Sequence, residues 1–423
     1  MSRTRFLGHT HTALGVVAVL ALSACSSGGS PTPSAITSSA GSPAPTTAPA
    51  TPTATATPTT TRDASAPANV YAGTGPGDLA TPARAAKPMV YIPNSAQNTV
   101  QLIDPATFRV VRTFAVGREP QHVVPSWDLL TLWVNSDKGN QLTPINPRTG
   151  KQGKPIHVED PYNLYFTPDG RHALVMAERL HRIDVRNPHT MRLQRSLPVK
   201  CWGINHADYT ADLEHFVASC EFSGQLLVID RGATKVEKII NLNKKKSPGA
   251  DSPMHAKMSS GPKSQIRPGA SAMPQDVRLS PDGRWFLAAD MLRNGVWVID
   301  ARTFTIKRFV HTGKGAHGIY PSRDATRIFV SNRDEGTVSV LDAATLRQVA
   351  RWKIPGGGSP DMGGVTADGT QLWLSGRYNS RVYVLDTTTG HLLRSIRVNA
   401  GPHGMAVWPQ PGTYSLGHTG NMR

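Results

Sequence analysis

Histidines recur in similar local settings along this chain. The run GKGAHGIYPSRD places His317 before a glycine and an apolar pair, while PQHVVPSWD and PHGMAVWPQPG carry His122 and His403 in related runs. Imidazole, together with carboxylate, is a usual ligand of zinc, copper and iron. A residue of this kind that is repeated in one local setting indicates a site to which several structural units each contribute one side chain.

The runs recur at a regular interval. Aligned on the residue two places after the proline or its equivalent, they give one position per unit: His122, Asn163, His206, Asp276, Gly318, Met362 and Gly404. The interval is a little over forty residues, with a longer gap only between His206 and Asp276. A period of this length is typical of arrays of small sheets.

Each unit also contains further short strands. Segments such as VWVID and VYVLD end in an acidic residue before a polar turn, and segments such as VYIPN, LWVNS and IFVSN precede them. Four strands per unit, bounded by Pro and Gly, predict an all-β fold, a seven-bladed β-propeller of four-stranded antiparallel blades. The first unit lacks its own inner strand. We therefore expect the segment near Gly404 to complete the blade of residues 89–117 and close the ring.

The segments VYIPN, WVNS and FVSN, with SPDG and TPDG corners, resemble the repeats of YVTN-type propellers. The resemblance covers the chain from about Lys87 to the C terminus and is strongest for exported actinobacterial YncE-like proteins. It implies the propeller fold. The same family includes lactonase-like enzymes and propellers similar to the haem-binding domain of cytochrome-type nitrite reductases. Because one propeller serves many functions, the resemblance implies no single activity.

The loops that lead into the inner strands of a propeller meet at one mouth of its channel. We therefore expect seven polar side chains to converge there: His122, Asn163, His206, Asp276, His317, Asp361 and His403. Two interpretations remain open. Either the histidines hold copper or another transition metal, or the polar groups brace loops and ordered water and no cofactor is required. The candidate metal ligands are His122, His206, His317 and His403.

Two cysteines lie close to His206 in the sequence. A hairpin that starts at Asn205 and turns near Asp212 would bring Cys220 back toward the channel mouth, and Cys201 lies just before His206 in the sequence. Because an exported chain lies in an oxidising compartment, a disulfide between them is the favoured interpretation. A copper-type cluster of the two thiols with His206 is the alternative.

The first 25 residues have the features of an export signal: two arginines, a short apolar run and the motif LSAC, which ends at Cys25. LSAC resembles the bacterial lipobox, which implies a lipid on Cys25 and a location on the outer face of the cell membrane. Residues 26–87 are rich in Ser, Thr, Pro and Ala and are predicted to be a disordered linker and lead-in. Residues 88–423 are predicted to form the propeller.

The chain is strongly basic, with a formal net charge of +17. The long gap between units holds a basic insertion, residues 243–273, which is predicted to be a mobile loop and contains MHAKM (Met254, His255 and Met258), a further candidate for copper. The charge predicts attraction to anionic envelope polymers or to another envelope protein, in addition to the membrane. Export argues against nucleic acid as a partner.

The sequence contains no nucleophile elbow, no P-loop and no His-Glu-x-x-His motif. We therefore predict an extracytoplasmic, lipid-anchored propeller that acts as a binding or scaffolding module at the cell envelope, rather than an enzyme. The alternative is a metal- or haem-associated redox protein, or a lactonase-like hydrolase, that uses the same channel mouth.

The lipid anchor gives the first testable prediction. Replacing Cys25 with Ser removes the thiol that would carry the lipid, so the protein is expected to move from the membrane fraction to the medium. Fractionation followed by immunoblotting measures the change. Retention of the Cys25→Ser protein in the membrane would contradict the anchor.

Overall fold

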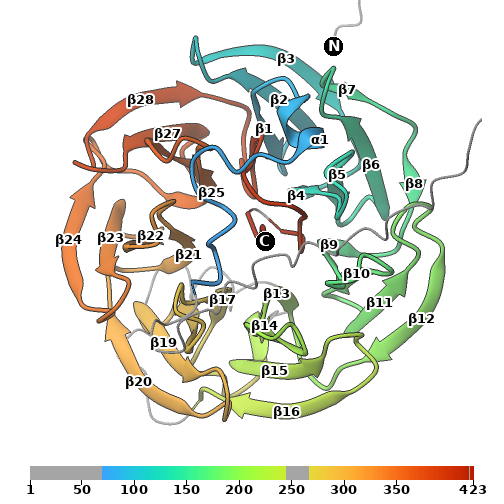
Figure 1. Cartoon of the computed structure of the whole chain (residues 1–423), viewed down its shortest axis with the longest axis vertical. Helices are drawn as coiled ribbons and strands as arrows, with labels where there is room; N and C mark the ends of the chain where they lie inside the picture. The colour runs from blue at the N-terminus through green and yellow to red at the C-terminus, as the bar shows by residue number, and fades with distance from the viewer. Residues whose placement is uncertain (1–68, 244–265, 419) are drawn as a thin grey trace, which may run out of the picture. The chain divides into compact units, whose positions relative to one another are not determined.

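Seven antiparallel β-sheets form a ring around a central channel (Figure 1). The computed structural model describes residues 69–243, 266–418 and 420–423. Within them each sheet is one blade, in which consecutive strands run from the channel outward. The predicted seven-bladed, four-stranded propeller is therefore confirmed. None of the helices in these residues is long and apolar enough to cross a membrane.

The strands of the first four blades follow the repeat. The first blade contains β29 (Ala406–Trp408), β1 (Met89–Asn94), β2 (Thr99–Asp104) and β3 (Arg109–Ala115). The second contains β4 (Pro120–Pro125), β5 (Leu132–Ser136), β6 (Gln141–Asn146) and an outer strand split into β7 (Lys151–Gln152) and β8 (Ile156–His157). The third contains β9 (Pro161–Phe166), β10 (Ala173–Ala177), β11 (Arg182–Arg186) and β12 (Leu193–Pro198). The fourth contains β13 (Ile204–Tyr209), β14 (His215–Cys220), the short 3-10 helix η1 (Glu221–Ser223), β15 (Gln225–Asp230) and β16 (Val236–Asn241).

The remaining three blades repeat the same order. The fifth contains β17 (Pro274–Leu279), β18 (Trp285–Asp290), β19 (Gly295–Asp300) and β20 (Ile306–His311). The sixth contains β21 (Ala316–Pro321), β22 (Arg327–Asn332), β23 (Thr337–Asp342) and β24 (Gln348–Lys353). The seventh contains β25 (Pro360–Val365), β26 (Gln371–Gly376), β27 (Arg381–Asp386) and β28 (Leu392–Arg397).

The core lies between the blades rather than within them. Seven apolar clusters each combine side chains of two neighbouring blades, one cluster for every interface of the ring. At one interface, for example, Val217 and Val228 of the fourth blade pack with Phe286 of the fifth. A single sheet cannot bury both of its faces, so each blade depends on its neighbours for stability.

The ring is closed by the C-terminal segment. Strand β29 pairs with β1 in antiparallel register, Met89 opposite Trp408 and Tyr91 opposite Ala406. This confirms the predicted closure of the first blade. Beyond β29 the chain continues inward, so that the C terminus lies at the centre of the ring (Figure 1).

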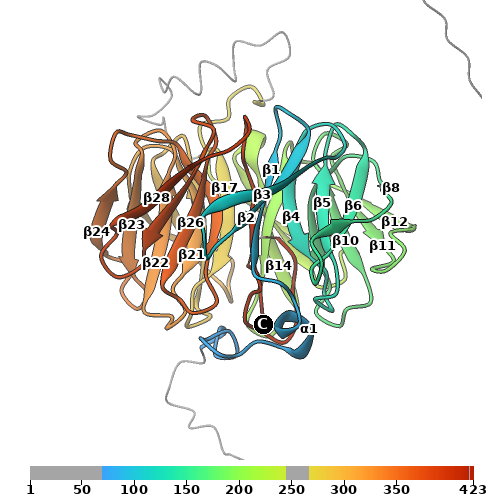
Figure 2. The ribbon, with the colours of Figure 1, turned by 90° about the horizontal axis from the view of Figure 1, so that it is seen from above.

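Residues 69–87, which the sequence pattern groups with the linker, belong to the folded unit. The Tyr71 hydroxyl donates to the Leu279 carbonyl at 2.8 Å, and Ala83, in the helix α1 (Thr81–Arg84), is fully buried. This lead-in crosses the face at which the inner strands end and lies beside the C-terminal tail (Figure 2). It therefore covers one end of the channel.

Part of the predicted mobile insertion is also folded. Ile266 and Met273 are buried in a small cluster with Phe222, Met291 and Leu292. These apolar side chains pack at the edge of the fourth and fifth blades. Met254, His255 and Met258 lie outside the described residues, as does Cys25.

The C-terminal segment packs tightly against the second blade at the seam of the ring, the place where Gly404 meets His122. A Cβ added at Gly404 would lie 2.0 Å from Cδ2 of His122, whereas one added at Gly364, in a neighbouring inner strand, would have no atom closer than 3.5 Å. We expect Gly404→Ala to lower the free energy of unfolding by about 1–3 kcal/mol and Gly364→Ala by less than about 1 kcal/mol. Denaturant unfolding at constant m-value measures both, and equal effects would contradict the close approach at the seam.

Candidate functional site

An extra residue in each inner strand decides which side chains face the channel. In the fourth blade Ile204 pairs with Cys220 and Ala207 with Ala218, so that Asn205 and His206 together stand opposite one residue of β14. The same irregularity recurs at the same place in all seven inner strands. Successive side chains of a regular strand point to opposite faces, whereas a bulge re-aims one of them. Two consecutive positions of each blade therefore contribute to the channel, in two layers.

The upper layer contains a buried carboxylate between two imidazoles. Asp361 binds His403 Nδ1 through one oxygen, at 2.7 Å, and His317 Nδ1 through the other, at 3.0 Å. Arg333 pairs with the same carboxylate. Burial alone would raise the pKa of Asp361, but the guanidinium and the two imidazoles hold that pKa well below its ordinary value. Asp361 is therefore an anion whose partners fully account for its charge.

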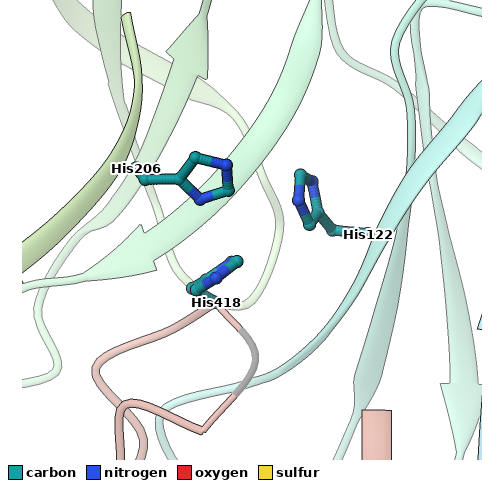
Figure 3. Close-up of side chains that lie close together, drawn as sticks. All are labelled: His122, His206 and His418. Carbon is teal, nitrogen blue, oxygen red and sulfur yellow. The ribbon is translucent and has the colours of Figure 1, made fainter. Parts of the chain in front are cut away.

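The lower layer brings three histidines together. His122 and His206, from the second and fourth blades, face His418, which belongs to the C-terminal tail (Figure 3). The ring centroids lie 5.4 Å apart for His122 and His206 and 4.7 Å apart for His206 and His418. Asn163, from the blade between them, places its amide nitrogen 3.3 Å from Nδ1 of His206 and 3.1 Å from Nδ1 of His418.

All five of these imidazoles are held neutral. Burial lowers the pKa of His122 to about 3 and that of His317 to about 4. Burial, reinforced by neighbouring histidines or by arginine, lowers the pKa values of His206, His403 and His418 well below 6.5. A neutral imidazole keeps one nitrogen lone pair available as a ligand or hydrogen-bond acceptor.

The predicted residues are therefore arranged differently from the expectation. The sequence places the four histidines together at one mouth of the channel, and each is at most 2% exposed because the blades close tightly around the channel. They also divide into two groups: His122 and His206 join His418, whereas His317 and His403 bind Asp361. The repeat could not reveal His418, since the tail that carries it lies outside the repeating pattern. Its backbone N–H donates to the Leu164 carbonyl at 3.0 Å, which holds the tail beside the third blade.

Asp276 belongs to the lower layer, where its Oδ1 lies 3.7 Å from Nε2 of His418. Its Oδ2 accepts the backbone N–H of Ile319 at 2.9 Å and lies 3.5 Å from Arg278, which is itself buried. Below it Asp208 pairs with Arg423 at 2.8 Å and accepts from the backbone N–H of Leu279. Asp276 and Asp361 thus pair with separate arginines, Arg278 and Arg333.

A second ring of side chains surrounds the open end of the channel. The residue that directly follows the second strand of each blade points there, and the seven are Ser95, Asp137, Glu178, Glu221, Met291, Arg333 and Arg377. Three acids thus stand on consecutive blades and two arginines on another consecutive pair. The sequence contains the signal for these five charged residues, because each directly follows a VNS, VMA, ASC, VSN or LSG segment.

Five of these residues, the three acids and the two arginines, line a cavity of about 240 Å³ above the upper layer. His317 and His403 form part of its floor, and Tyr162, Gln121 and Gln275 complete its lower wall. The volume is near or below the smaller end of the range for small-molecule sites, about 300–1,000 Å³. The cavity as it stands therefore has room for a small ligand.

The two walls of the cavity differ in charge. Burial raises the pKa of Glu178 well above its ordinary value, and the neighbouring acids Glu221 and Asp137 raise it further. Burial also raises the pKa of Glu221, and burial together with Asp160 raises that of Asp137 to about 7. These raised pKa values favour the neutral form of the acidic wall, whereas the other wall carries the guanidinium groups of Arg333 and Arg377.

The two cysteines are joined. The sulfurs of Cys201 and Cys220 form a disulfide, with their Cα atoms 5.8 Å apart, beside the paired ends of β13 and β14. The thiols are thus not metal ligands in this structure, and His206 bonds instead with Asn163. The alternative of a copper cluster of Cys201, Cys220 and His206 does not match this arrangement.

Comparison with protein families identifies the fold family. The profile of the YNCE-like beta-propeller family matches residues 63–193 and 263–411, about two thirds of the chain. The chain belongs to the YncE-like β-propeller family. No curated protein matches the sequence.

Solved structures extend the likeness of this YncE-like propeller. Hydrazine synthase of Kuenenia stuttgartiensis is similar with a TM-score of 0.57 and 17% identity, covering 74% of this chain and 96% of that chain. A functionally unknown protein from Desulfotomaculum acetoxidans DSM 771 is similar with a TM-score of 0.56 and 14% identity, covering 75% of this chain and 98% of that chain. Dihydro-heme d1 dehydrogenase NirN, solved in complex with DHE, is similar with a TM-score of 0.53 and 14% identity, covering 78% of this chain and 76% of that chain. At these identities the similarity shows the fold and no activity.

The neutral histidines predict how acid affects stability. Below pH 6.5 the unfolded chain binds a proton at residue 122, whereas the native protein binds it only near pH 3, so lowering the pH favours unfolding. In metal-free protein, His122→Gln should therefore lose less stability than the wild type between pH 6.5 and pH 5, by up to about 2 kcal/mol. Replacing the exposed His189 in the same way is the control. Denaturant unfolding at each pH gives the slopes, and parallel slopes for His122→Gln and wild type would show that the pKa of His122 is the same in the native and unfolded states, which would contradict the prediction.

Proposed function

We propose that this chain is an extracytoplasmic, lipid-anchored propeller that binds a small carboxylate or phosphate anion at the cationic wall of its channel mouth. The anion is either free or the charged group of an envelope polymer. The proposal combines the arrangement of arginines and protonated acids with the lipobox-like motif at Cys25.

One observation carries the proposal: two guanidinium groups from neighbouring blades line one wall of a small cavity. Arg377 is half-buried, and its guanidinium donates a long hydrogen bond, 3.4 Å, to Gln121 Oε1. Arg333 is held in place by Asp361 and by a 3.4 Å contact with the Tyr378 hydroxyl. A guanidinium offers five N–H donors in a planar fork that suits carboxylate and phosphate.

The opposite wall supports the same ligand. Glu178 is 7% exposed, and its Oε1 has no hydrogen-bond partner among the described residues. In its protonated form this carboxyl can donate to an anion that the arginines hold. Asn205 donates to Glu221 at 2.7 Å, which fixes the adjacent carboxyl. The cavity would thus surround a small anion with donors on both sides.

The location is supported by two independent features. LSAC at residues 22–25 resembles a lipobox, and the disulfide between Cys201 and Cys220 suits an oxidising compartment. The high net positive charge of the chain favours an anionic envelope surface as its surroundings.

Calorimetric titration tests the anion site. We expect succinate and inorganic phosphate to bind, and succinamide, which has the size of succinate without its charge, not to bind. Arg377→Ala should weaken binding roughly 10- to 100-fold, since a hydrogen bond to a charged group contributes about 1.5–3 kcal/mol. Arg171→Ala removes the same charge from a side chain that is 81% exposed at the other end of the channel and should leave affinity unchanged.

Sedimentation with isolated cell envelopes separates the two sources of the anion. If the wild-type protein sediments with the envelopes and Arg377→Ala does not, the bound anion is a group of an envelope polymer. If the protein binds succinate or phosphate but does not sediment with the envelopes, the bound anion is a free metabolite. The proposal is wrong if neither probe nor envelope binds, or if Arg377→Ala binds as well as wild type.

A further inference from the structure

We propose that His122, His206 and His418 form a binding site for a divalent transition metal of the zinc type, with three imidazole ligands and a fourth position facing the cavity. The site lies below the anion cavity and uses none of its arginines. The inference therefore goes beyond the proposed function and does not depend on it.

The geometry brings one ligand atom of each histidine within 4.8 Å of the other two. The three rings come from different segments and point toward one common space (Figure 3). Nitrogens bound to one zinc ion at about 2.0–2.1 Å in a tetrahedral arrangement lie roughly 3.4 Å apart. Small rotations of the rings would therefore convert the present cluster into a three-nitrogen site.

Two of these imidazoles carry nitrogen atoms without a partner. Nε2 of His122 and Nε2 of His206 are buried and make no hydrogen bond with the described residues. Both side chains are fully buried. A buried polar atom that is left unpaired costs about 1–3 kcal/mol. Two such atoms beside a third imidazole indicate an occupant of the space between them.

His122 is already in the form that a metal requires. Its Nδ1 lies 2.9 Å from the Tyr162 carbonyl, an acceptor, so Nδ1 carries the proton and Nε2 keeps its lone pair. A ligating histidine commonly donates its other N–H to a carbonyl or carboxylate, which fixes the tautomer and the ring orientation. The Tyr162 carbonyl has that role here.

Asn163 is placed to orient the other two rings. Its amide nitrogen lies close to Nδ1 of both His206 and His418. With the amide turned by half a rotation, its oxygen would accept N–H from both rings in place of the Leu164 N–H that it accepts now. Nε2 of His206 and Nε2 of His418 would then keep their lone pairs, the second of them 3.7 Å from Oδ1 of Asp276. Amide orientation and histidine tautomer are chosen by the hydrogen-bond network. A metal would therefore select one of two arrangements that Asn163 permits.

The donor set favours zinc-type metals. Three neutral imidazoles suit zinc, copper and nickel, and the thiols that would favour softer ions are joined in a disulfide. His317 and His403 are held by Asp361, so they do not compete for the ion. The His403 ring lies 4.9 Å from that of His122, between this site and the cavity. The fourth coordination position of the metal would thus lie on the side of the channel mouth.

Cobalt titration tests the site on the folded protein, purified without a histidine tag and treated with a chelator. One equivalent of Co²⁺ should give the visible d–d bands of a tetrahedral ion and raise the melting temperature, and Zn²⁺ should displace it. His206→Gln and His418→Gln should each weaken Co²⁺ binding more than roughly 100-fold, since even the loss of an outer-sphere partner costs 10- to 100-fold. His189→Gln and His255→Gln, which alter an exposed histidine and the one in MHAKM, should bind as wild type.

Two substitutions of Asn163 separate a metal site from a purely structural cluster. Asn163→Leu should weaken Co²⁺ binding roughly 10- to 100-fold, whereas Asn163→Asp, which accepts N–H from both rings, should bind at least as tightly as wild type. Metal-free melting curves establish that each variant is folded. The inference is overturned if wild type binds no Co²⁺, if His206→Gln and His418→Gln retain tight binding, or if His255→Gln abolishes it.

Discussion

The interior of this propeller depends on one extra residue in each inner strand. A regular strand would direct only every second side chain into the channel. The bulge places both members of a pair there, such as Asn205 with His206 or Gln275 with Asp276. Seven strands therefore supply two layers of polar groups in a channel that is otherwise enclosed by apolar interfaces. The candidate sites arise from this stacking.

Enclosing so many polar groups requires that they neutralise one another. Asp361 is balanced by Arg333 and two imidazoles, and Asp208 by Arg423 of the tail. Where no counterion is near, burial removes the charge instead, as the raised pKa of Glu178 and the lowered pKa of His122 show. Buried ions persist in proteins when they are paired, and otherwise change protonation state. The channel thus contains the Asp208–Arg423 pair at its covered end, neutral imidazoles in the middle and the guanidinium groups of Arg333 and Arg377 at its mouth.

The C-terminal tail connects fold and site. Strand β29 completes the first blade, and the residues after it cross the second, third and fourth blades, where His418 and Arg423 meet side chains of the inner strands. The same segment therefore closes the ring, covers one end of the channel and adds the third imidazole. Changes in this tail should affect stability and metal binding together, which is why the metal-free melting curves matter.

Much of the site's membership could be predicted, but not its grouping. The repeat selected His122, His206, His317 and His403 because inner strands of a propeller share one position facing the channel. It could not separate the two layers, because the bulge that sets them apart has no residue type of its own. Nor could it select His418, whose tail has no repeat, or anticipate that Arg333 would bind Asp361 while Arg377 lines the open cavity.

By itself, the sequence determined the number of blades, their four strands and the closure of the ring. The repeat period and the alternation of short strands with polar turns are local properties, and every unit of the chain repeats them. The tertiary structure alone decided which polar side chains meet, how deeply they are buried and which remain charged. The reason is physical: contacts across the channel join residues from different blades, and their protonation depends on the water that the complete ring excludes.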